Sequence, residues 1–337
     1  MTGPRGPGTE STFVRLNQPL TYWNALGLFA GFGTLIGVAL AGDRTRGATL
    51  RAVACGAAVP CGLASALTLS RGASVAILAG LAVCVLVRGG RGTLLAAGCA
   101  LGPIVALGIS LSAFPDVLTL GSDRDAQATQ GAIFTPIVLL VTVAAGVAFA
   151  RLRRTRAAAV DLRLRRPTRP RVAAALVLAV LGVAVAVAGS GTESTDVPRT
   201  AERITRVETN RGRYWSVALD AFARHPLNGV GTGSFRVEWT RERGHQRAAY
   251  DAHSLYVETL AELGIVGALL LLAFLGTLAV AVLRAARDSP RDAGTAAAAA
   301  VVAAFVVHVG LDWDWEMPTV VLVLLIVGAA ALARRPA

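Results

Sequence analysis

Apolar stretches long enough to cross a lipid bilayer dominate this chain of 337 residues. A membrane-spanning helix needs about 20 consecutive, mostly apolar residues. About nine such stretches follow one another, at residues 21–41, 51–69, 72–87, 92–111, 131–150, 171–188, 259–283, 293–309 and 317–332. Charged residues make up only 16% of the sequence, which is less than a water-soluble domain carries. The sequence therefore predicts an all-α, polytopic transmembrane helix bundle that forms a single integral membrane domain over residues 1–337.

Arginine supplies all 33 basic residues, and the formal net charge is +12. The arginines concentrate in every second loop, at positions 44–51, 88–91, 151–171, 284–291 and 334–335. Because positively charged loops remain in the cytoplasm, this alternation sets the topology. It favours contacts with anionic membrane lipid over binding of nucleic acid. We predict a multi-pass protein of the inner (cytoplasmic) membrane, with the N-terminus outside and the C-terminus inside.

Residues 189–258 form one large predicted extracytoplasmic loop within this domain. Its apolar residues Trp215, Ala218, Leu219 and Phe222 recur at helical spacing, which predicts an amphipathic helix over 211–224 at the membrane surface. A proline at position 226 ends this helix, because the residue before a proline is disfavoured in helical conformation. Long loops that are not disordered in composition usually carry function.

Two features of this loop are open to more than one interpretation. The glycines at 229, 231 and 233 form either a plain tight turn or a backbone cradle for a diphosphate. The ten arginines of the loop either bind an anionic ligand or pair with its nine acidic residues.

His253 can accept a proton near neutral pH, although an isolated histidine of this kind is more often structural than catalytic. Asp251 is a plausible N-cap, which would place His253 in the first turn of the next helix and Glu258 on a different face. Asp312, Asp314 and Glu316 are expected to form a solvated outer rim beside interfacial tryptophans. The four cysteines, Cys55, Cys61, Cys84 and Cys99, lie within predicted helices, and neither they nor the acids show a metal-ligand spacing. We therefore predict no metal site and no cofactor.

The large loop resembles the signature of the O-antigen ligase and polymerase family. The residues that carry the resemblance are Arg211, Tyr214-Trp215, Ala221-Phe222, His225-Pro226-Leu227, Gly229-Val230-Gly231, Gly233-Ser234-Phe235, His253-Ser254-Leu255-Tyr256, Glu258 and Glu262-Leu263-Gly264-Ile265-Val266-Gly267. Outlying matches are Arg15-Leu16, Pro19-Leu20, Tyr22-Trp23-Asn24-Ala25, Ser70-Arg71-Gly72, His308 and Asp312-Trp313-Asp314-Trp315-Glu316-Met317-Pro318. The chain departs from the family in having Ser254, where asparagine is common, and in having fewer N-terminal helices. We expect a truncated or misassigned start.

The resemblance implies transfer of a glycan from an undecaprenyl-diphosphate carrier to a hydroxyl of a glycan, lipid or protein acceptor, without ATP or a nucleotide sugar. Such chemistry needs cations for the diphosphate leaving group and a base for the acceptor proton. On this basis His253 is the predicted base. Arg71, Arg211 and Arg213 are the predicted catalytic cations, and Arg15, Gly229, Gly231 and Glu258 are predicted to bind substrate.

Two other functions fit the same composition. A polymerase of this family would extend the glycan on its lipid carrier. One protein sequence does not distinguish a polymerase from a ligase. A transporter or flippase of lipid-linked sugars would also be polytopic, but transporters place functional charges at mid-membrane. Here the polar residues gather in one outside loop, which favours an enzyme.

Overall fold

The computed structural model describes residues 15–88, 91–118, 122–154, 211–243, 248–289 and 292–333, and every regular element in these ranges is helical. The predicted span at 171–188 and the first part of the large loop lie outside them.

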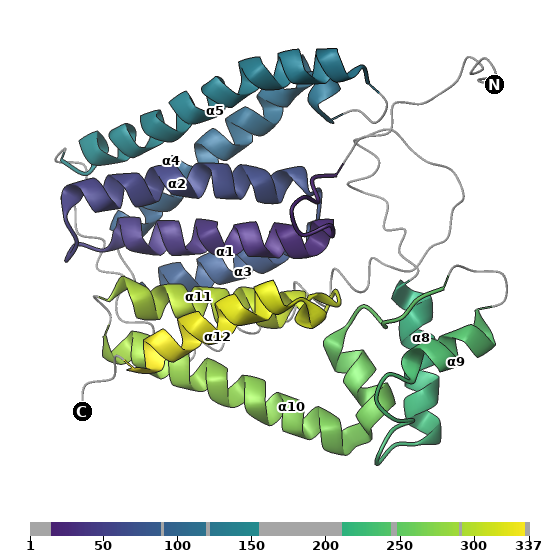
Figure 1. Ribbon diagram of the computed structural model, residues 1–337. Helices are drawn as coiled ribbons and strands as arrows, with labels where there is room; N and C mark the ends of the chain where they lie inside the picture. Colours follow the sequence, from purple (N-terminus) through teal and green to yellow (C-terminus); the bar gives the residue numbers. More distant parts are fainter. Residues whose placement is uncertain are drawn as a thin grey trace, which may run out of the picture.

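Eight long helices form a bundle (Figure 1). They are α1 (Trp23–Gly42), α2 (Ala48–Leu67), α3 (Arg71–Arg88), α4 (Arg91–Ser110), α5 (Arg124–Leu152), α10 (Leu255–Asp288), α11 (Ala293–His308) and α12 (Pro318–Ala333). Six of them, α1 to α5 and α10, are long and apolar enough to cross a membrane, whereas α11 and α12 are shorter apolar helices. The all-α polytopic architecture is confirmed, and eight of the nine predicted spans correspond to these helices.

Helix α1 is the central helix of the bundle, because close packing at its glycines lets α2 and α3 approach. A Cβ atom on Gly37 would lie 2.7 Å from the carbonyl oxygen of Ala54 in α2. A Cβ atom on Gly31 would lie 2.4 Å from the side chain of Ile77 in α3. Small residues of this kind allow helices to pack closely where the hydrophobic effect is weak.

The outer faces of α5 and α10 carry large apolar side chains that pack against nothing in the described chain. On α5, Leu140 is 70% exposed, and on α10, Leu270 is 67% exposed. Such faces are stable in hydrocarbon but not in water. The chain is therefore a multi-pass membrane protein.

The helix ends gather at two opposite ends of the bundle. At one end, the carboxylate of Asp43, after α1, lies 3.8 Å from the guanidinium of Arg88 and accepts from the backbone N–H of Ala293 at 3.3 Å. At the other end, the N-terminal ends of α1 and α3 meet the start of α10 and the segment 309–317. This grouping agrees with the alternation of loops predicted from the arginines.

Helices α8 (Arg211–Arg224) and α9 (Phe235–Glu242) lie outside the bundle, beside the beginning of α10 (Figure 1). They enclose a small core of their own that contains Trp239, Phe235 and Ala218, all of which are fully buried or nearly so. The predicted amphipathic helix is confirmed as α8, including its end before His225.

The backbone of α10 is broken at Gly264, which has a φ of 63°. The turn at 226–231 enters this break. The N–H groups of Ile265 and Val230 donate to the carbonyl oxygens of Pro226 and Ala261, at 2.8 and 2.9 Å. Carbonyl and N–H groups freed by a helix break cost several kcal/mol each in an apolar medium unless they find partners. The turn therefore fixes α8 and α9 to α10.

Replacement of Gly264 by alanine is expected to destabilise the protein. The new Cβ would lie 2.2 Å from the carbonyl oxygen of Leu227, and a positive φ alone costs alanine about 1 kcal/mol or more. Gly276→Ala is the matched control in the same helix, because no atom lies within 4 Å of its Cβ position. Thermal unfolding in detergent should show a lowered Tm for Gly264→Ala only. Equal values for the two variants would contradict the role of the break.

Candidate active site

The carboxylate of Asp312 lies at the centre of a polar cluster at the end of the bundle next to α8. It accepts from the guanidinium of Arg211 at 2.8 Å and from the hydroxyl of Tyr22 at 2.5 Å. The side-chain amide of Asn24 and the backbone N–H of Trp313, at 2.9 Å, also donate to it. Asp312 is only 1% exposed, so these donors replace water around its charge. One buried carboxylate thus joins α1, α8 and the segment after α11.

The expectation of a solvated acidic rim was wrong for two of the three acids. Asp312 and Asp314 are buried, and only Glu316 is exposed. The segment 309–317 folds back between α11 and α12, which turns Asp312 toward Arg211 and Asp314 toward His308. Each buried carboxylate meets a basic side chain, the condition under which a buried acid is tolerated.

His253 precedes α10 rather than lying in its first turn, so the predicted capping was also wrong. Ser254 is the N-cap, and its hydroxyl accepts from the N–H of Val257 at 3.5 Å. His253 has a φ of 56°, the left-handed region that few residues other than glycine adopt. Backbone held in this region persists where surrounding contacts impose it, often at functional sites.

The imidazole of His253 is held so that one nitrogen remains able to accept a proton. Its Nδ1 lies 3.0 Å from the carbonyl oxygen of Asp251, and the ring lies 5.2 Å from the ring of Tyr214. A carbonyl oxygen only accepts, so Nδ1 carries the hydrogen and Nε2 keeps its lone pair. Burial lowers the pKa of His253 below its ordinary value of 6.5, although Asp312 acts in the opposite direction. The ring is therefore neutral at pH 7, as a base must be.

Glu258 supports the loop before His253 rather than the imidazole itself. Its carboxylate accepts from the backbone N–H of Ala252 at 2.7 Å, and the residue is buried. Glu258 thus holds the backbone adjacent to His253, and its contact with substrate stays a prediction.

Two of the other predicted cations lie at the same end of the bundle as Arg211. Arg71 is the first residue of α3, and its charge lies close enough to that of Arg211 for the two to act on each other. The guanidinium of Arg15 lies 5.2 Å from the ring centre of Trp23, next to Tyr22. The structure therefore gathers Arg15, Arg71, Arg211 and His253 around the Asp312 cluster.

Arg213 is directed away from this cluster. Its guanidinium donates to the carbonyl oxygen of Glu242 at 3.0 Å and lies 5.8 Å from the ring centre of Trp239, both in α9. We therefore assign Arg213 to the packing of α8 on α9.

The glycine turn forms a cradle for an anion, but that anion is a carboxylate of the chain. The backbone N–H groups of Gly233 and Phe235 donate to the carboxylate of Glu262, at 2.9 and 3.0 Å. The N–H groups of Gly229 and Gly231 donate to the backbone carbonyl oxygens of His225 and Glu262, both at 2.9 Å. Because these donors have internal partners, the interpretation as a plain turn fits better than a diphosphate cradle.

Three acids that the sequence did not link, Asp251, Glu258 and Glu316, place carboxylate oxygens within 4.8 Å of one another. They are the described residues that are best arranged to hold a cation. Burial and the neighbouring Glu316 raise the pKa of Asp251 to about 7. Near neutral pH Asp251 is therefore partly protonated, and its carboxyl group can hydrogen-bond to Glu316, which ties the His253 loop to the segment 309–317.

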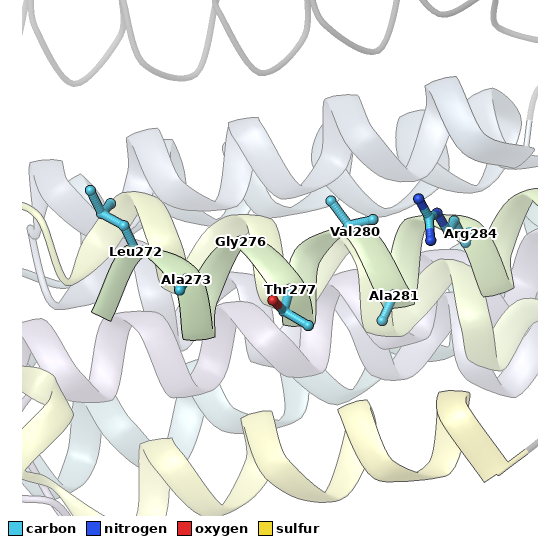
Figure 2. Close-up of a pocket in the computed structure, with 7 residues that line it drawn as sticks. All are labelled: Leu272, Ala273, Gly276, Thr277, Val280, Ala281 and Arg284. Atoms are coloured by element: carbon cyan, nitrogen blue, oxygen red, sulfur yellow. The ribbon is translucent and has the colours of Figure 1, made fainter. Parts of the chain in front are cut away.

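A separate pocket of about 590 Å³ lies along α10 (Figure 2). The described residues that line it come from α10 alone: Leu272, Ala273, Gly276, Thr277, Val280, Ala281 and Arg284. It lies beyond the break at Gly264, in the part of α10 that is remote from Leu255. Thr277 and Arg284 are its polar side chains, so it lacks the converging acid, base and cations of the Asp312 cluster.

Part of this arrangement lies in a segment that matches a known protein family. The family model for O-antigen ligase matches residues 126–272. This segment, less than half of the chain, is similar to the O-antigen ligase family. The resemblance inferred from the sequence is thereby confirmed, and it supports a role in glycan transfer at a membrane. No curated protein matches the chain. The O-antigen ligase segment includes Arg211 and His253, whereas Tyr22, Arg71 and Asp312 lie outside it.

Tyr22, Asn24 and Asp312 are the site residues that sequence reasoning missed. They were part of the outlying resemblance, but Asp312 was expected only in a solvated rim, and no role followed for Tyr22 or Asn24. Burial and Asp312 raise the pKa of Tyr22, so its hydroxyl stays a donor to Asp312. The sequence did carry a signal that could have found these residues. Polar residues recur at helix ends that the predicted topology places on one side of the membrane.

Glu316→Gln should weaken the loss of stability that accompanies a rise of pH toward about 7. The pKa of Asp251 in the folded protein lies above its unfolded value of 3.8, so folding favours the protonated form and stability falls as pH rises through about 7. Without the Glu316 charge, Tm should decrease less between about pH 5.5 and about pH 8.5. The exposed Glu242→Gln serves as the control. Parallel pH curves for wild type and Glu316→Gln would refute the effect of Glu316 on the pKa of Asp251.

Proposed function

We propose that this protein transfers a glycan from an undecaprenyl-diphosphate carrier to an acceptor hydroxyl at the outer face of the cytoplasmic membrane. The observation that carries the proposal is the meeting of a neutral histidine with arginines from three elements at one end of a membrane bundle. His253 contributes the base, and Arg71, Arg211 and Arg15 contribute the positive charge. The match of residues 126–272 to the O-antigen ligase family model supports the same reaction class.

The reaction requires one bond to form and one to break at the anomeric carbon of the donor sugar. The acceptor oxygen attacks that carbon, its proton passes to Nε2 of His253, and the bond to the diphosphate oxygen breaks. The leaving group is undecaprenyl diphosphate, whose developing charge is stabilised by the arginines. Guanidinium groups suit this role because their fork of N–H donors matches phosphate oxygens bidentately. This chemistry needs neither ATP nor a metal or other cofactor.

Asp312 orients Arg211 for this task. Its ion pair with Nη2 of Arg211 engages one part of the guanidinium, and hydrogen bonds from Tyr22 and Asn24 hold the carboxylate itself. A guanidinium has five N–H donors, so donors remain for a phosphate oxygen. An arginine held by a buried carboxylate also loses less rotamer freedom when substrate binds.

A polymerase of the same family is the second candidate, because it would use the same residues with a lipid-linked acceptor. A transporter is less well supported. Its functional charges would lie at mid-membrane, whereas Asp312, His253 and Arg71 lie at helix ends.

His253→Ala should lower the rate of transfer by about 10²-fold to 10⁴-fold while leaving donor binding nearly unchanged, because a general base acts only in the transition state. The assay is transfer from purified lipid-linked donor in liposomes, with folding checked by gel filtration. His225→Ala, which changes an exposed histidine next to α8, is the matched control. Because the pKa of His253 is lowered, the acid limb of the wild-type pH–rate profile should lie below about 6.5. Wild-type rates in folded His253→Ala would remove this histidine from the mechanism.

Arg71→Lys should also reduce transfer strongly, because a single ammonium group does not reproduce the bidentate contact with a diphosphate. The loss should appear in the KM for the donor as well as in kcat. Arg236→Lys, at an exposed arginine of α9, controls for the loss of a guanidinium. Full activity in Arg71→Lys would mean that Arg71 only contacts lipid headgroups.

A further inference from the structure

A fully buried pair of ionisable side chains, His308 and Asp314, lies behind the Asp312 cluster. Both residues have an exposed fraction of 0%. His308 is the last residue of α11, and Asp314 begins the short 3₁₀ helix η4 (Asp314–Glu316). The Nδ1 atom of His308 contacts the Oδ2 atom of Asp314. The proposed transfer reaction uses neither residue.

The backbone of His308 holds the residue that binds Arg211. Its carbonyl oxygen accepts from the N–H groups of Leu311 and Asp312, at 2.8 and 3.0 Å. The ring of His308 meanwhile binds Asp314, two residues beyond Asp312. Both sides of Asp312 are therefore tied to one histidine, which fixes where its carboxylate lies.

The opposite edge of the same ring packs on the backbone next to Arg71. A Cβ atom on Gly72 would lie only 3.2 Å from Nε2 of His308. A side chain at this position would make the ring shift by a few tenths of an ångström. His308 is thus in contact with the start of α3 on one edge and with the Asp312 segment on the other.

The segment 309–317 also holds the loop that contains His253. The N–H of Leu255, two residues after His253, donates to the carbonyl oxygen of Val309 at 2.8 Å. A Cβ atom on Gly310 would lie 2.9 Å from the ring of Tyr256, whose hydroxyl donates to Val306 at 2.6 Å. The elements that carry Arg71, Arg211 and His253 therefore all meet the segment that His308 anchors.

We propose that the buried His308–Asp314 pair is a positioning pair that sets the separation between Arg71 and the Asp312–Arg211 ion pair to match a lipid-linked diphosphate. The inference rests on the proposed function, because it assigns both arginines to the same leaving group. Two guanidinium groups repel each other, so a rigid partner is needed to keep them near one ligand. A buried polar pair provides such rigidity, because neither group finds another partner if it moves.

The pair acts on binding of the donor rather than on the acceptor proton, which separates positioning from a merely structural role. A structural role would lower the amount of folded protein and leave the KM of the folded fraction unchanged. A positioning role raises the KM for the donor in the folded protein.

The test compares Gly72→Ala with Gly98→Ala in transfer from a purified undecaprenyl-diphosphate-linked glycan in liposomes. Gly98 lies in α4, and no atom lies within 4 Å of its Cβ position. Gly72→Ala should raise the donor KM by about tenfold, a typical effect of slight misplacement, while Gly98→Ala stays at the wild-type value. His308→Leu should behave like Gly72→Ala. His308→Asn should restore part of the binding, because its amide nitrogen can replace Nδ1 as donor to Asp314.

Donor KM values within about twofold of wild type in both Gly72→Ala and folded His308→Leu would overturn the positioning role while the proposed function stood. A wild-type protein that neither transfers the glycan nor binds undecaprenyl diphosphate would overturn both. If His308→Leu does not fold, Gly72→Ala decides alone, because alanine is favourable within a helix.

Discussion

The structure depends on how the backbone groups freed at Gly264 are satisfied. A helix that crosses hydrocarbon keeps its N–H and C=O groups paired internally, and a break leaves several without partners. Here the turn at 226–231 supplies them, with hydrogen bonds on both sides of the break. Its own glycines allow this approach, since a Cβ on Gly229 would lie 2.3 Å from the backbone of Glu262. The hydrogen bonds that satisfy the broken backbone of α10 therefore also hold α8 and α9 against α10.

Docking of α8 brings Arg211 to the end of the bundle where α1 and α3 begin. The buried carboxylate of Asp312 then pairs with Arg211, and His308 holds Asp312 in place. Charges are costly to bury unless each has a partner, so this end of the molecule tolerates few rearrangements. Such rigidity suits a reaction whose leaving group is a diphosphate, because donors fixed in advance need no reorganisation in the transition state.

Local patterns in the sequence were sufficient to predict the eight long helices and α8. The spacing of apolar residues and the proline at 226 predicted α8 with the bounds that the structure has, and His253 lies beside the cluster as a candidate base should. The pairing of Tyr22 and Arg211 with Asp312 could not be predicted from local patterns, because these contacts join residues that are 290 and 101 positions apart. Likewise, nothing near Gly233 in the sequence indicated that Glu262 would fill the glycine turn.

The most direct test of the account is a structure of the purified protein in lipid nanodiscs with undecaprenyl diphosphate. We predict density for the diphosphate between Arg71 and Arg211, on the side of the bundle end that His253 faces, with the Asp312–Arg211 ion pair intact. Density in the pocket along α10, or at the opposite end beside Asp43 and Arg88, would contradict the assignment of this cluster as the active site.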